Sequence, residues 1–166
     1  MSLQPCEIVR EGGEYKDFKF MVKALYQTIS RMIGLKREAI GGVVYVQDKQ
    51  KRIEEVELFI DSSGRIKDID KLRLAGAKRG LNISDLNGLV DEILRKYRLI
   101  KILKNPQDYS YYFQTPLSLR KLLEEFPELT QRGYIEKLPQ YFQNRIRSIL
   151  EIRELKSKIV ETKLNG

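Results

Sequence analysis

The stretch GLNISDLNGLVDEILRKYRLIKILKNPQDYSYYFQT, residues 80–115, sets the architecture of this chain. Its first part predicts a turn, GLNI, that leads into an amphipathic helix over residues 84–97. Ser84 suits the position before the first helical turn, because its hydroxyl can accept a hydrogen bond from a free backbone amide, and Asp85 then complements the helix dipole. The residues expected on the apolar side of this helix are Leu86, Leu89, Val90, Ile93, Leu94 and Tyr97.

The sequence around this helix predicts a second helix before it and a hairpin after it. Leu72, Ala75 and Gly76 fit a short helix that begins at Ile69 and is stopped by Gly80. RLIKIL and YSYYFQT predict two strands that pair around the turn KNPQD, where a proline fixes the backbone. Alternation in the second strand favours a core-facing side for three of its aromatic residues, although exposed rings could instead stack on unpaired bases. The three residues are Tyr109, Tyr111 and Phe113.

Five residues around the turn form a further pattern: a small residue inside the first helix, a glycine that opens the turn, and three apolar residues after it. They are Gly76, Gly80, Leu81, Leu86 and Leu89. With the order helix, tight turn, helix and hairpin, residues 66–115 resemble a winged helix-turn-helix module. The resemblance implies that the helix over residues 84–97 reads the major groove of duplex DNA, and that residues 104–108 form the tip of the wing.

Positive charge is concentrated in the same part of the chain. The sequence has a formal net charge of +8, and residues 71–104 contain nine basic and three acidic residues, a net charge of +6. This cluster favours a polyanionic partner, whose phosphates contact lysine and arginine while short polar groups meet base edges. The alternative is an ordinary solvated surface. The expected phosphate contacts are Lys78, Arg79, Arg95, Lys96, Arg98, Lys101 and Lys104; the expected base-edge contacts are Ser84, Asn87 and either Asn105 or Gln107, with Gly88 admitting a close backbone.

The N-terminal lobe, residues 1–65, is expected to be one helix laid over a small antiparallel sheet. Apolar residues recur at spacings of three and four, which predicts a helix that ends near Gly34. VVYVQ and VELFID then predict two antiparallel strands, and RIKDI a third short one. The residues that carry the helical spacing are Tyr15, Phe18, Val22, Leu25, Ile29 and Met32.

The C-terminal segment, residues 116–166, is expected to be helical. A short helix begins at Pro116, and a long one covers about residues 139–163. Such a helix exceeds what a small domain easily covers, so it either clamps the N-terminal lobe or pairs with its copy in a homodimer, and we favour the homodimer. Its apolar positions are Phe142, Ile146, Ile149, Ile152, Leu155 and Ile159.

Composition excludes several classes of protein. The 166 residues are 42% hydrophobic and lack an apolar run of the roughly 18 residues that a membrane span needs, so we expect a cytoplasmic protein. There is one cysteine and no histidine, which argues against a disulfide, a zinc site and most enzymes. The acidic group formed by Glu54, Glu55, Glu57 and Asp61 indicates an outward strand face rather than the metal site of a nuclease.

The sequence therefore predicts a predominantly helical α+β protein with three parts, residues 1–65, 66–115 and 116–166. We expect a DNA-binding winged-helix regulator of transcription that acts as a homodimer, with no catalytic residue, metal or cofactor. The alternative is a protein–protein assembly module that docks through the winged helix and the C-terminal helix.

Overall fold

The computed structural model describes the backbone of residues 6–16, 18–31, 34–47, 53–56, 59–60, 64–67, 69–78 and 80–165, and the side chains of residues 8–16, 18–24, 60, 64–67, 69–78 and 80–159. The chain forms two compact units, Met1–Lys101 and Ile102–Gly166. The predicted α+β class with a predominance of helix is confirmed. The division between the units falls inside a helix, whereas the sequence led us to expect boundaries near residues 65 and 115.

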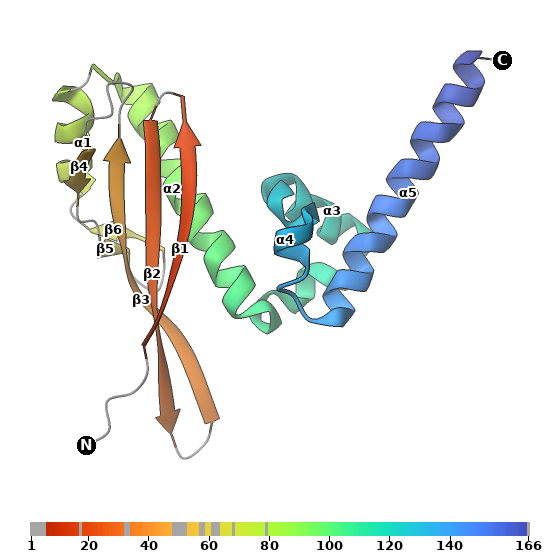
Figure 1. The fold of residues 1–166 in the computed structure, drawn as a ribbon, viewed down its shortest axis with the longest axis horizontal. Helices are drawn as coiled ribbons and strands as arrows, with labels where there is room; N and C mark the ends of the chain where they lie inside the picture. Colours follow the sequence, from red (N-terminus) through yellow and green to blue (C-terminus); the bar gives the residue numbers. More distant parts are fainter. Residues whose placement is uncertain are drawn as a thin grey trace. The chain divides into compact units, whose positions relative to one another are not determined.

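The first unit contains a four-stranded antiparallel sheet in the order β1-β2-β3-β4 (Figure 1). The strands are β1 (Cys6–Tyr15), β2 (Phe18–Arg31), β3 (Gly34–Gln47) and β4 (Ile53–Val56). A β-bulge interrupts the pairing of β2 with β3 between Ala24 and Tyr26. A second sheet pairs β5 (Phe59–Ile60) with β6 (Ile66–Lys67). The strands expected in VVYVQ and RIKDI are confirmed by β3 and β6. The single strand expected in VELFID is wrong, because Val56 ends β4 whereas Phe59 and Ile60 form β5 of the other sheet.

The prediction of a helix from Tyr15 to Met32 is wrong, because Tyr15 ends β1 and residues 18–31 form β2; Met32 lies outside the described residues. Phe18, Phe20, Val22 and Ala24 are buried, while the residues between them are less buried or exposed. That period of two is typical of a strand with one face on a core. Phe18 and Val22 are four residues apart and so fit a helix equally well; the alternation in FKFMVKA decides between the two structures. Gly34, expected to end the helix, begins β3.

The two predicted central helices are confirmed as α1 (Ile69–Lys78) and α2 (Ile83–Lys104). Asn82 rather than Ser84 caps α2, since its side-chain Oδ1 accepts a hydrogen bond of 2.8 Å from the backbone N–H of Asp85. The strand expected in RLIKIL is wrong, because α2 continues through it. The apolar residues of RLIKIL are buried like those earlier in the helix, and residues 98–105 contain no glycine or proline that would end it.

The second strand of the expected hairpin is also wrong. Residues 106–113 form the 3₁₀ helix η1 (Pro106–Phe113), in which Pro106 takes an initial position. Phe113 is buried and stacks on Phe142 with ring centroids 4.3 Å apart. Residues 98–115, all of which the structure describes, thus contain no strand, and the module has no wing.

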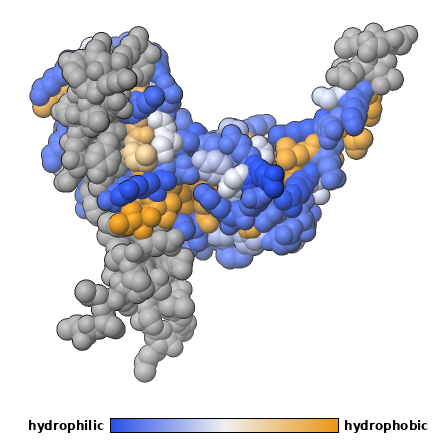
Figure 2. Space-filling view, viewed as in Figure 1, coloured by the Kyte–Doolittle hydropathy of each residue, from blue (hydrophilic) through white to orange (hydrophobic). Residues whose placement is uncertain are grey.

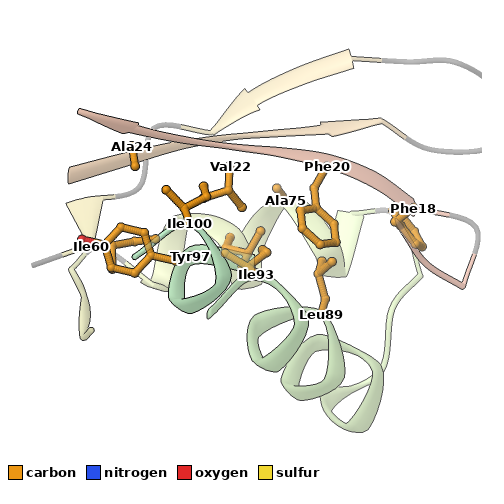
Figure 3. Packing of buried hydrophobic residues seen from close by; sticks show 11 residues of the cluster. Phe18, Phe20, Val22, Ala24, Ile60, Ala75, Leu89, Ile93, Tyr97 and Ile100 are labelled. Atoms are coloured by element: carbon orange, nitrogen blue, oxygen red, sulfur yellow. The ribbon is translucent and has the colours of Figure 1, made fainter. Parts of the chain in front are cut away.

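The core of the first unit lies between the sheet and the two helices. Phe18, Phe20, Val22 and Ala24 of β2 point toward α2 (Figure 3). The helix pair therefore shares its core with the N-terminal strands, instead of closing on a hairpin of its own. The helical residues of this cluster are Leu72 and Ala75 of α1 and Leu89, Ile93, Tyr97 and Ile100 of α2.

The second unit is helical, which the sequence predicts for residues 116–166 but not for residues 102–115. After η1 it contains α3 (Pro116–Glu125), the 3₁₀ helix η2 (Pro127–Thr130), α4 (Arg132–Ile135) and α5 (Gln140–Asn165). Thr115 caps α3, since its side chain accepts a 3.2 Å hydrogen bond from the backbone N–H of Ser118. The core residues contributed by α3 and α5 are Leu119, Leu122, Leu123, Phe142, Ile146 and Ile149. Among the described residues, no helix is long and apolar enough to cross a membrane.

Candidate nucleic-acid interface

The turn between α1 and α2 depends on Gly80. This residue has a φ of 80°, in the left-handed region that a side chain disfavours. Two backbone hydrogen bonds close the end of α1: Leu81 N–H donates to Gly76 O at 3.0 Å, and Gly80 N–H donates to Ala77 O at 3.1 Å. Together they form a Schellman motif, which ends the helix and reverses the chain within a few residues.

Gly76 allows α2 to lie close to α1. A β-carbon at this position would overlap the Leu86 side chain and lie 3.2 Å from Cδ1 of Leu81. Leu86 and Leu89 are both buried. Gly76, Gly80, Leu81, Leu86 and Leu89 thus form the packing and the turn between α1 and α2, while the expected wing is absent from residues 98–115.

The N-terminal end of α2 is covered on one side by the turn between β1 and β2. Lys16 at that turn forms an ion pair with Asp85. A β-carbon on Gly88 would overlap the ring and hydroxyl of Tyr15. Gly88 therefore admits Tyr15, and the expectation that it admits the backbone of a nucleic acid is wrong. Sequence reasoning missed Tyr15 and Lys16, because their segment fits a helix equally well.

The outward side of α2 carries a row of polar residues. Ser84, Asn87, Asp91 and Arg98 are all exposed, and their spacings of three, four and seven place them on one face of the helix. Ile83, at the start of the same helix, is 78% exposed. Ser84 and Asn87 therefore face outward at the N-terminal end of α2, as the sequence predicts.

The predicted cations do not form one surface. Lys78 and Arg98 are exposed, whereas Lys96 is only 9% exposed, so our prediction of an exposed Lys96 is wrong. Lys96 lies three residues after Ile93 and four before Ile100, on the inward side of α2. Arg79 lies outside the described residues.

Two further predicted residues, Arg95 and Lys101, contact side chains of their own helix. Arg95 is half-buried and its Nη2 lies 2.7 Å from Oε1 of Glu92. Lys101 Nζ lies 5.5 Å from the ring centroid of Tyr97, a cation–π contact. Lys104 and Asn105 are half-buried and belong to the second unit, and Asn105 precedes η1 without a capping hydrogen bond from its side chain. Of the predicted contacts, Lys78, Ser84 and Asn87 are exposed, with Lys78 at the end of α1 before the Gly80 turn and the other two in α2 after it.

The aromatic residues of η1 do not share one buried side, contrary to the prediction. Phe113 is core, but Tyr111 is 55% exposed, and its ring centroid lies 4.3 Å from that of Tyr112. The pKa of Tyr111 is raised to about 12; the largest cause is a side-chain hydrogen bond with Tyr112, and desolvation is the next largest. The rings of Tyr109 and Tyr112 lie 6.5 Å apart and nearly parallel. The shared strand face expected for Tyr109, Tyr111 and Phe113 is therefore wrong.

The described residues do not gather into a metal site. Among them, no group of three or more histidine, cysteine, aspartate or glutamate side chains converges on a possible metal position. Glu54 and Glu55 lie in β4, and the side chains of the acidic group around them are outside the described ones. Comparison with models of known protein families, with curated proteins and with solved structures finds no significant match to this chain.

Proposed function

We propose that this protein is a cytoplasmic DNA-binding regulator that contacts duplex DNA through α1, the Gly80 turn and the N-terminal half of α2, without a wing. The observation that carries the proposal is the close packing of α2 on α1 at Gly76, combined with the outward direction of Ser84 and Asn87. This combination supports a helix fixed on one side by a core and open to a groove on the other.

The proposed contacts follow from the chemistry of the exposed side chains. An asparagine amide can form two hydrogen bonds with the major-groove edge of adenine, and a serine hydroxyl can meet several base edges, so Asn87 and Ser84 would supply selectivity. Lys78 lies just before the turn and would contact a phosphate, which adds affinity that does not depend on sequence.

The acidic residues limit how much of α2 can approach DNA. Asp91 is exposed on the same face, about 10 Å along the helix from Ser84 at 1.5 Å per residue, and would be repelled by phosphates. Asp85, in contrast, is paired with Lys16, which offsets its charge beside the helix N-terminus. We therefore confine the reading surface to the first two turns of α2.

Binding of a generic duplex by the full chain, measured by fluorescence anisotropy, tests this proposal. Asn87→Glu places a carboxylate in the centre of the proposed surface and should abolish binding, whereas Gln131→Glu makes the same change at an exposed position of the second unit and should have little effect. Equal binding by the two variants would refute the proposed surface.

A second candidate function, protein assembly, is favoured by one specific observation. Three large apolar side chains that would ordinarily be buried are exposed on the C-terminal half of α5. They are Ile152, Leu155 and Ile159. Exposed apolar rows of this kind are typical of surfaces that bind another protein.

A further inference from the structure

The helix α5 changes its environment along its length. Phe142, Ile146 and Ile149 are buried in the second unit. From Glu151 to Ile159, in contrast, every side chain is exposed, including three large apolar ones: Ile152 is 39% exposed, Leu155 59% and Ile159 55%. Hydrophobic surface is visible along this helix in Figure 2. The exposed part of α5 thus presents apolar area to solvent.

The exposed apolar residues belong to a heptad pattern that is separate from the core face. Six exposed positions of α5 follow one another at spacings of four, three, four, three and four, the spacing that a two-stranded coiled coil requires. The last three positions are apolar. The six residues are Tyr141, Arg145, Ser148, Ile152, Leu155 and Ile159.

A groove adjoins the same row of residues. It has a volume of about 60 Å³ and is lined by α5 together with η1 and α3. Ile152 and Ser148 belong both to the lining and to the heptad row, so the groove opens beside the row. The apolar part of its wall is formed by Phe113, Pro116, Leu119, Ile149 and Ile152.

We propose that α5 pairs with α5 of a second copy of this chain in an antiparallel arrangement, in which Ile152 of each copy faces Leu155 of the other. This register places Ile159 of each copy opposite Ser148 of the other, next to the groove. The exposed apolar residues of both copies are then covered together.

Charge complementarity supports the second copy as the occupant. In this register, Glu151 of each copy flanks the seam opposite Lys158 of the other, so that two ion pairs form by symmetry. In the structure Lys158 Nζ lies 3.5 Å from Glu154 Oε1 on the same helix, and both side chains are 68% exposed. A parallel arrangement would instead place the two Arg145 side chains against each other, which is unfavourable.

Sedimentation velocity of the full chain, without DNA, tests the pairing. The seam is short, so we expect a weak dimer with a dissociation constant on the order of 10–100 µM. Leu155→Glu should give a monomer at all concentrations up to the millimolar range. Leu74→Glu is the matched control, because Leu74 is 60% exposed on α1, and it should leave the dimer unchanged. A monomeric natural chain, or a dimer that tolerates Leu155→Glu, would overturn the proposal.

Charge reversal tests the orientation. Glu151→Lys and Lys158→Glu should each weaken the dimer about tenfold, since each converts two attractive pairs into repulsive ones. The double variant should restore the natural dissociation constant. Restoration by Glu151→Lys with Lys156→Glu instead would show a parallel pair and refute the antiparallel register. Because no DNA is present, a failure here is distinct from a failure of the proposed DNA binding.

Discussion

Replacing Gly80 by alanine tests the turn on which the proposed interface depends. The φ of 80° puts residue 80 in the left-handed region, and no atom lies within 4 Å of a β-carbon built there. The cost is therefore conformational rather than steric, about 1–2 kcal/mol. For a unit of roughly 100 residues, each kcal/mol lowers the melting temperature by about 4–8 °C.

Two measurements are combined: unfolding in urea, monitored by circular dichroism, and DNA binding. Gly64→Ala is a matched control, since Gly64 has a φ of 85° and similarly open surroundings. We expect both variants to lose about the same stability, but only Gly80→Ala to weaken DNA binding, because only Gly80 sets the angle between α1 and α2. Gly133→Ala, in an open position of α4, should not destabilise the protein. A Gly80→Ala variant as stable as the natural chain would refute the left-handed turn.

Further substitutions test other parts of the structure. Gly76→Leu should cost about 2–3 kcal/mol in the free energy of unfolding, because the added side chain overlaps Leu86; an unchanged urea midpoint would contradict this packing. Phe113→Ala should cost about 3–5 kcal/mol, whereas Tyr111→Ala should cost far less; equal losses would mean that η1 is wrongly oriented. Tyr111 should ionise near pH 12, and Tyr112→Phe should shift its phenolate absorbance titration toward pH 10. Since the pKa of Tyr111 is raised in the folded protein, its contribution to stability is complete below about pH 10 and is lost between about pH 10 and 12.

Helices α1 and α2 and the turn between them could be predicted because their signals are local. Gly80 supplies a backbone conformation that few residues adopt, and Gly76 precedes Leu81 and Leu86 at distances set by the turn itself. Neither depends on what the rest of the chain does. The long C-terminal helix was predictable for a similar reason, since its apolar residues recur at spacings of three or four over about five turns.

The errors arose where two spacings fit the same residues. In β2, Phe18 and Val22 satisfy both a helix and a strand, and pairing with the neighbouring strands β1 and β3, which the spacing within this one segment does not reveal, decides between them. RLIKIL has a strand-like composition but continues an existing helix, so extending α2 costs less than starting a new element. Without that strand, the aromatic residues that follow have no hairpin partner.

The candidate site was predicted in part. The direction in which a side chain of α2 points follows from the helical period, which is why the exposure of Ser84 and Asn87 could be predicted. The burial of Lys96 was not predicted, because the sequence does not show how the sheet packs on α2. The contacts of Tyr15 and Lys16 with α2 also join segments about 70 residues apart, and no local pattern indicates them.

The sharpest test of DNA binding by α1 and α2 is its salt dependence, measured for the natural chain, Lys78→Glu and Lys121→Glu. Both lysines are exposed and both substitutions change the net charge equally, but only Lys78 lies beside the Gly80 turn. The proposal predicts that the affinity of the natural chain for DNA falls steeply between about 50 and 200 mM salt. Lys78→Glu should weaken binding and lower the slope of log K against log salt by about one. Lys121→Glu should change neither the affinity nor the slope. Absence of binding at about 50 mM salt, or equal effects of the two substitutions, would contradict a DNA-binding surface on α1 and α2.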